Sequence, residues 1–130
     1  MKVIDSDLII AILKNNQDAV KKLKELSADN ERLSTTVINA QEVLAGAKAR
    51  ENRKQFKDAL RFFDALDPIG YDLDSVHQEI EIDNFLRKKG TPIGAFDTII
   101  AGICVSHGAT IVTRNIDHFK HVPGLSVEKW

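Results

Sequence analysis

The feature that most constrains this sequence is an uninterrupted run of apolar and small residues from Thr98 to Val105, preceded by Gly94 and Asp97. A helix that is apolar on all sides is buried inside a protein. Asp97 falls in the first turn of this predicted helix, where the positive end of the helix dipole stabilises a carboxylate. Its position is therefore explained either by the dipole alone or by a metal site at the start of the helix.

The length and charge of the chain limit what it can be. With 130 residues, the sequence predicts one domain, spanning 1–130, with a single hydrophobic core. A net charge of −1 gives no general attraction for nucleic acid, so only a local basic patch can provide one. The only cysteine, Cys104, cannot form an intramolecular disulfide, which suits a reducing compartment. No apolar run approaches the ~20 residues that span a bilayer, and charges interrupt the N-terminus too early for a signal peptide. We therefore expect a cytoplasmic protein.

Strand-like and helix-like segments alternate along the chain. This alternation predicts an α/β domain with a largely parallel sheet and helices on both faces. The predicted strands are 3–4, 33–37, 69–71, 109–113 and 125–127, and the predicted helices are 8–13, 17–26, 39–46, 52–66, 72–89 and 94–108.

Four acidic residues fall where such a fold brings chain segments together. The carboxyl ends of parallel strands and the first turns of the following helices share one edge of the sheet, where ligands bind. Like charges gathered there repel one another unless a cation neutralises them. Carboxylate oxygens favour Mg²⁺ or Mn²⁺, ions that support phosphoryl chemistry. The alternative is that the four acidic residues form no common site, and that each is a helix cap or an ordinary surface residue. The four residues are Asp5, Glu42, Asp97 and Asp117.

Glu42 has a structural explanation of its own. Asn39–Ala40–Gln41–Glu42 has the form of a capping box, with Asn39 as the helix cap and Glu42 at the third helical position. On this interpretation the Glu42 carboxylate stabilises its own helix and takes no part in a site.

Four ordered motifs carry a resemblance to a known family. The chain resembles the PIN-domain ribonucleases, and most closely the VapC toxins of type II toxin–antitoxin pairs. The resemblance implies a single PIN-like three-layer α/β/α domain with a short, largely parallel central sheet. The motifs are Val3–Asp7, Thr36–Val43, Gly90–Ala101, and Gly108–Asn115 followed by Phe119 and Val122–Leu125.

This resemblance implies a function and partners. It implies a Mg²⁺- or Mn²⁺-dependent endoribonuclease that hydrolyses phosphodiester bonds in single-stranded RNA or RNA loops. It also implies a homodimer and a cognate VapB-like antitoxin whose C-terminal segment fills the acidic crevice. Asp5, Glu42 and Asp97 would carry the metal. Ser6 would orient Asp5, and Asp7 would support these ligands from behind.

The sequence departs from the family at the fourth polar position of the site. Relatives carry an acid or Asn where Asn115 stands, or an acid where His118 stands. We expect Asn115 to polarise a metal-bound water or to order the site. Asp117 lies one residue short of the second place, and its role as a metal ligand stays open. The histidines form no zinc-like pairing with Cys104, so we expect His118 to be a surface or structural residue.

RNA also needs positive charge near the site. The densest basic run lies on and beside the helix predicted at 52–66, and its alternative role is that of a solvated helix face. From this run Arg50, Arg53 and Lys54 are candidate RNA contacts, together with Arg114. The whole run comprises Lys48, Arg50, Arg53, Lys54, Lys57 and Arg61.

Three other functions fit part of the pattern. A catalytically silent PIN-like binding module would keep the acids without turnover. A haloacid-dehalogenase-like phosphatase would use Asp5 as nucleophile and Asp7 as general acid. Such an enzyme also needs a pair of acidic residues later in the chain, but Asp97 has no acidic neighbour. A receiver-like signalling domain needs a Lys after the last core strand, where this chain has Arg114.

Overall fold

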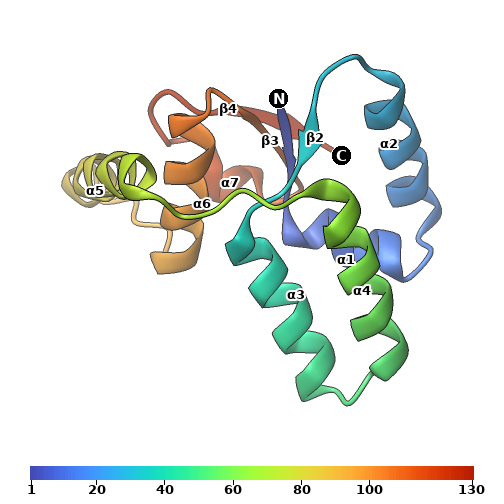
Figure 1. Ribbon diagram of the computed structural model, residues 1–130. Helices are drawn as coiled ribbons and strands as arrows, with labels where there is room; N and C mark the ends of the chain where they lie inside the picture. Colours follow the sequence, from blue (N-terminus) through green and yellow to red (C-terminus); the bar gives the residue numbers. More distant parts are fainter.

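The computed structural model describes all 130 residues, arranged as seven helices around four strands (Figure 1). In chain order the elements are β1 (Lys2–Ile4), α1 (Ser6–Leu13), α2 (Gln17–Ala28), β2 (Leu33–Ser34), α3 (Val37–Ala49), α4 (Arg53–Leu66), α5 (Leu73–Lys88), α6 (Ala95–Ser106), β3 (Thr110–Thr113), α7 (Ile116–Phe119) and β4 (Ser126–Lys129).

The sheet is short and entirely parallel, with the strand order β2-β1-β3-β4. Val3 in β1 pairs with Ser34 on one side and with Ile111 on the other. The chain thus moves from β1 to one neighbour and later returns to its other side. The order reverses at β1, so the crevice beyond the carboxyl ends of β1 and β3 is the expected ligand site. The predicted parallel α/β architecture is confirmed.

Alternating strand residues serve two separate cores. Val3 and Ile111 pack into one core with residues of α5, α6 and α7. Ile4 and Val112 pack into the other with residues of α1, α2, α3 and α4. Successive side chains of a strand point to opposite faces, so two apolar residues in a row require helices on both faces. The three-layer arrangement is therefore confirmed.

Several boundaries differ from the prediction: β2 covers only Leu33–Ser34 of the strand expected at 33–37, and α7 was not expected. Helix α3 starts at Val37, because the Thr36 hydroxyl accepts a hydrogen bond from the Asn39 N–H at 3.1 Å and caps the helix. The expected Asn39 cap is wrong, and Glu42, in the second turn, does not cap α3. The segment 69–71 forms only one isolated bridge, between Thr36 and Ile69. The last strand covers Ser126–Lys129.

Helices α5 and α6 approach closely at Gly102, which is buried within α6. A Cβ atom at this position would lie 2.8 Å from the Ser75 carbonyl oxygen and 2.9 Å from the Glu79 nitrogen. Both are backbone atoms of α5, so no side-chain movement can make room. A residue without a side chain is therefore required where these two helices cross.

We expect Gly102→Ala to lower the free energy of unfolding by about 1–3 kcal/mol, as overpacked cores do. The clash should outweigh the ~1 kcal/mol that Ala gains over Gly in a helix. Gly70→Ala is the matched control, since a Cβ there meets nothing within 4 Å. Urea denaturation of both variants measures the difference, and an unchanged midpoint for Gly102→Ala would contradict the close approach.

Candidate active site

Three of the four acidic residues singled out in the sequence, Asp5, Glu42 and Asp97, lie near one another at the carboxyl edge of the sheet. Asp5 follows β1 and is the cap of α1, and Asp97 is the third residue of α6. Glu42 lies in the second turn of α3, which packs against both α1 and α6. Asn115 follows β3 and precedes α7. Chain segments distant in sequence are therefore joined at one place.

Asp5 is the most firmly held of these residues. Its carboxylate accepts hydrogen bonds from the Ser6 N–H at 2.8 Å, from Asn39 Nδ2 at 2.9 Å and from the Thr113 hydroxyl at 2.6 Å. Asp5 is buried. Donors from α1, α3 and β3 thus fix both of its oxygens, and the carboxylate has little freedom to move.

Asp5 and Glu42 are both partly desolvated and both lie close enough to Asp97 to be affected by its charge. Burial raises the pKa of Asp5 to about 6, against the lowering effect of the Thr113 and Ser6 hydrogen bonds, and the charges of Asp7 and Asp97 raise it further. Burial also raises the pKa of Glu42, which a hydrogen bond with Ser6 lowers and the Asp97 charge raises. The site therefore concentrates negative charge from three chain segments.

Asn39 is a site residue that the sequence analysis missed. It is completely buried, its Oδ1 accepts from the Thr36 hydroxyl at 2.7 Å, and its Nδ2 donates to Asp5 and Ser6 at 2.9 Å each. The cap therefore lies at Thr36 because the Asn39 side chain is engaged with Asp5. A Thr three residues before an Asn was the available signal, since Thr is also a good cap.

Asp7 is occupied by structural hydrogen bonds. Its Oδ2 accepts from the Arg114 N–H at 2.9 Å and from the Thr113 hydroxyl at 3.2 Å, and its Oδ1 accepts from the Trp130 indole at 3.0 Å. The Arg114 guanidinium stacks over the Trp130 ring at 3.5 Å. Asp7 thus ties β3 and the last residue to α1, which supports the expected auxiliary role. An acid with these three donors is poorly placed to act as the general acid of a phosphatase.

Asp97 has a hydrogen-bond partner, His118, that was not among the expected site residues. His118 Nδ1 lies 2.7 Å from Asp97 Oδ2 and 2.8 Å from Asn115 Nδ2. His118 was expected to be a surface or structural residue, and its side chain is 49% exposed, but α7 directs its imidazole at Asp97. Asp117, by contrast, has a side chain that is 89% exposed and bonds to Lys120 at 2.9 Å. The structure therefore brings His118 and Asn115, and not Asp117, to the acidic residues.

The donor set suits a hard divalent cation. Asp5, Glu42 and Asp97 offer carboxylate oxygens, which Mg²⁺ and Mn²⁺ prefer, and burial leaves their charge poorly hydrated. No group of three or more His, Cys, Asp or Glu side chains lies close enough together to hold a metal ion by itself. Mg²⁺ usually binds only one or two protein carboxylates and completes its coordination with water and substrate.

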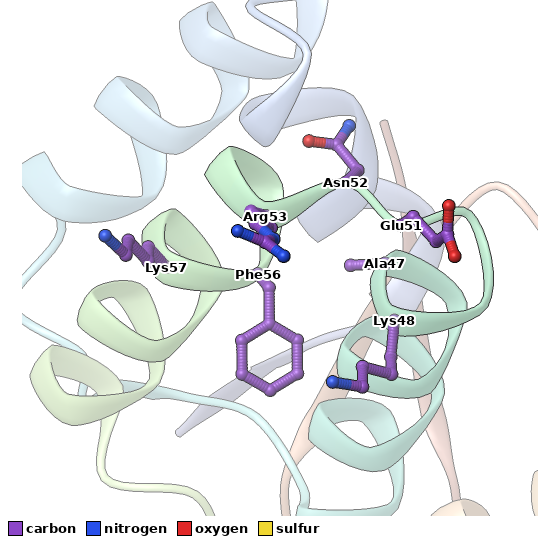
Figure 2. A pocket seen from close by; sticks show the side chains of 7 residues that line it. All are labelled: Ala47, Lys48, Glu51, Asn52, Arg53, Phe56 and Lys57. Atoms are coloured by element: carbon purple, nitrogen blue, oxygen red, sulfur yellow. The ribbon is translucent and has the colours of Figure 1, made fainter.

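A cavity of about 510 Å³ lies away from Asp5, Glu42 and Asp97, between the end of α3 and the start of α4 (Figure 2). The Phe56 ring points into the space between the two helices, beside Lys48. Of the candidate RNA contacts, Arg53 lines this cavity, whereas Lys54 pairs with Asp58 and Arg50 bonds to Gln55. The seven lining residues are Ala47, Lys48, Glu51, Asn52, Arg53, Phe56 and Lys57.

Comparison with known proteins agrees with this geometry. Residues 2–125 match the family model for the PIN domain. The chain is 28% identical to the tRNA(fMet)-specific endonuclease VapC of Salmonella typhimurium, over 98% of this chain and 96% of that protein. It is 27% identical to Ribonuclease VapC2 of Rickettsia felis, with the same coverage.

Solved structures show the same fold. The structure of VapBC2 from Rickettsia felis bound to a DNA fragment from their promoter matches with a TM-score of 0.88 and 27% identity, over 99% of this chain and 98% of that chain. DNA-bound VapBC from Salmonella typhimurium matches with a TM-score of 0.81 and 28% identity, over 99% and 97% of the two chains. None of the helices has the length and apolar character needed to cross a membrane.

Replacing Asp5 with Asn should stabilise the metal-free protein at pH 8 by about 1–3 kcal/mol, since one pKa unit corresponds to about 1.4 kcal/mol. Because its pKa is raised to about 6, the folded protein binds a proton that the unfolded chain has released. Its stability therefore falls as the pH rises from about 4 to about 6, where the folded-state carboxyl ionises.

Urea denaturation in EDTA, followed by Trp130 fluorescence, measures this gain at pH 8 and its disappearance near pH 4. Asp64→Asn, at an exposed position on α4, is the control and should change neither value. An equal gain at both pH values would mean that the Asp5 carboxylate is not the cause.

Proposed function

The chain belongs to the PIN domain family, and from this premise we propose that it is a VapC-type toxin, an endoribonuclease that uses Mg²⁺ or Mn²⁺. The observation that carries the proposal is the convergence of Asp5, Glu42 and Asp97 at the sheet edge, where the charge of Asp97 adds to burial in raising the pKa of Asp5 and of Glu42. A crevice of this charge repels a phosphodiester unless a cation is bound.

The residues of the site have different roles in the proposed reaction. Asp5, Glu42 and Asp97 hold the ion, which when bound neutralises the phosphate and activates water for hydrolysis. Ser6 and Asn39 fix the position of Asp5 through their hydrogen bonds. Asn115 orders the rim of the site from the end of β3.

The substrate we propose is single-stranded RNA or an RNA loop. An unpaired strand can enter an open crevice and expose its phosphodiester bonds there. Arg114, held against Trp130 and bonded through its N–H to Asp7, is a fixed cation next to the Thr113 that donates to Asp5. Arg50, Arg53 and Lys54 lie farther along the α3–α4 hairpin and offer contacts for more distant phosphates.

The proposed partner is a VapB-like antitoxin. The similar structures from Rickettsia felis and Salmonella typhimurium are VapBC complexes. A partner segment with basic residues would complement the negative crevice and exclude RNA from it. A toxin that cleaves cellular RNA acts in the cytoplasm, which agrees with the unpaired, buried Cys104.

A catalytically silent binding module is the alternative, and an RNA cleavage assay separates the two. We expect cleavage of a fluorogenic single-stranded RNA with Mg²⁺ or Mn²⁺ and none with EDTA. Asp97→Asn should lower the rate by more than the roughly 10–100-fold that loss of a supporting residue costs. Asp117→Asn is the control, and it should cleave almost as fast as the unmodified protein because Asp117 points away. Equal loss in the two variants, or cleavage that EDTA does not affect, would contradict the proposal.

We also propose that two copies associate through α5. Leu73 and Ile80, two helical turns apart on this helix, are 82% and 55% exposed, and Phe96 at the start of α6 is half exposed. Exposed apolar residues at helical spacing are typical of an interface.

Light scattering after gel filtration should give a dimer mass for the unmodified chain. The double substitution Leu73→Glu with Ile80→Glu should give a monomer, since it places charge on the apolar face. Leu60→Glu, at an exposed position on α4, is the control and should remain dimeric. A dimer that survives the double substitution would place the interface elsewhere.

A further inference from the structure

The imidazole of His118 is built into the acidic site. Helix α7 has only four residues, and its last one, Phe119, is completely buried in the core with α6. This anchor fixes the helix and leaves the preceding side chain facing α6. His118 Nδ1 therefore lies 2.7 Å from Asp97 Oδ2, although the two residues are separated by 21 positions in sequence.

Nδ1 cannot satisfy both of its neighbours. With a proton it donates to Asp97 but faces the Asn115 NH₂ group at 2.8 Å, and without one it accepts from Asn115 but faces a carboxylate. The amide of Asn115 can also be turned so that its oxygen occupies the nearer place. In the tautomer of His118 that carries its proton on Nε2, three atoms with lone pairs then meet at one place: Asp97 Oδ2, Asn115 Oδ1 and His118 Nδ1. A cation is the group that such an arrangement suits.

The distance between the Asp97 and His118 atoms also suits two ligands of one metal ion. Adjacent ligands of an octahedral ion with bonds of ~2.1 Å lie about 3 Å apart, close to the separation of Asp97 Oδ2 and His118 Nδ1. Imidazole nitrogen favours first-row transition metals, whereas Mg²⁺ favours oxygen.

We propose that His118 binds the metal ion of this site through Nδ1, beside Asp97, and that the site therefore prefers Mn²⁺ to Mg²⁺. The inference rests on the proposed metal-dependent function and names the ion that it uses. It assigns to His118 a role as ligand, which the expected set of oxygen ligands did not include.

Binding of Mn²⁺ to the protein tests this directly, without RNA. Pulsed electron paramagnetic resonance of the Mn²⁺-loaded protein should show coupling to a directly bound ¹⁴N nucleus, and labelling of histidine with ¹⁵N should shift it. His118→Asn should abolish this coupling and lower the Mn²⁺ affinity measured by calorimetry, by about the 10–100-fold known for groups that support metal sites. His77→Asn, at an exposed position on α5, is the control and should leave both unchanged.

A variant with an oxygen ligand keeps the test independent of folding. His118→Asp should bind Mn²⁺ without the nitrogen coupling, and its preference for Mn²⁺ over Mg²⁺ should fall about tenfold. The inference is overturned if the unmodified protein binds Mn²⁺ without nitrogen coupling, or if the coupling persists in His118→Asn.

The outcomes separate this inference from the proposed function. Metal-dependent cleavage without nitrogen coupling would leave the nuclease standing and overturn the role of His118. Nitrogen coupling without cleavage of any RNA would support the ligand and contradict the nuclease. Absence of any Mn²⁺ binding would overturn both.

Discussion

The structure depends on one buried carboxylate at the end of its central strand. Asp5 receives hydrogen bonds from α1, α3 and β3, so the ion that it would hold has a fixed position relative to all three elements. These bonds lower the free energy of the ionised form, but burial raises it by more, and the pKa of Asp5 lies near 6 as a result. At neutral pH the fold therefore keeps a charge that its own hydrogen bonds do not fully compensate. A buried charge that lowers the stability of the fold is expected at a binding site rather than at a purely structural position.

The three carboxylates reach this point from both sides of the sheet. Asp97 belongs to α6, which packs into one core, and Glu42 belongs to α3, whose Val43 packs into the other. Asp5 extends from the strand between them. Repulsion between Glu42 and Asp97 therefore acts across the two helical layers, and a bound divalent ion would reverse it. The metal would consequently contribute to the packing of α3 against α6 as well as to chemistry.

The sequence alone was sufficient for the layers and for the edge where the acids meet. Paired apolar residues such as Val3 and Ile4 predict a strand with helices on both faces, and parallel strands bring Asp5 and Asp97 to the same end. It was insufficient where two side chains compete for one role. Thr36 and Asn39 can each cap α3, and the choice depends on Asp5, which is 34 residues from Asn39. Asp117 and His118 are neighbours in α7, and only the burial of Phe119 decides which of the two faces Asp97.

The same reasoning explains why His118 was overlooked. A histidine next to a charged residue near a turn has no periodic pattern that reveals its direction, whereas an acid at the end of a strand does. A helix of four residues also has too few apolar positions to define a buried face. Its orientation is set by the packing of Phe119 in the core with α6 and by the Asn115 N–H, which donates to the Thr113 hydroxyl at the end of β3. The positions of Asn115 and His118, at the rim of the site, are thus specified by tertiary packing. The position of Asp5, at the end of the central strand, is specified by strand topology. Differences in ion preference among proteins with this fold are therefore expected to arise at the rim, where one residue can change while Asp5, Asn39 and the sheet stay in place.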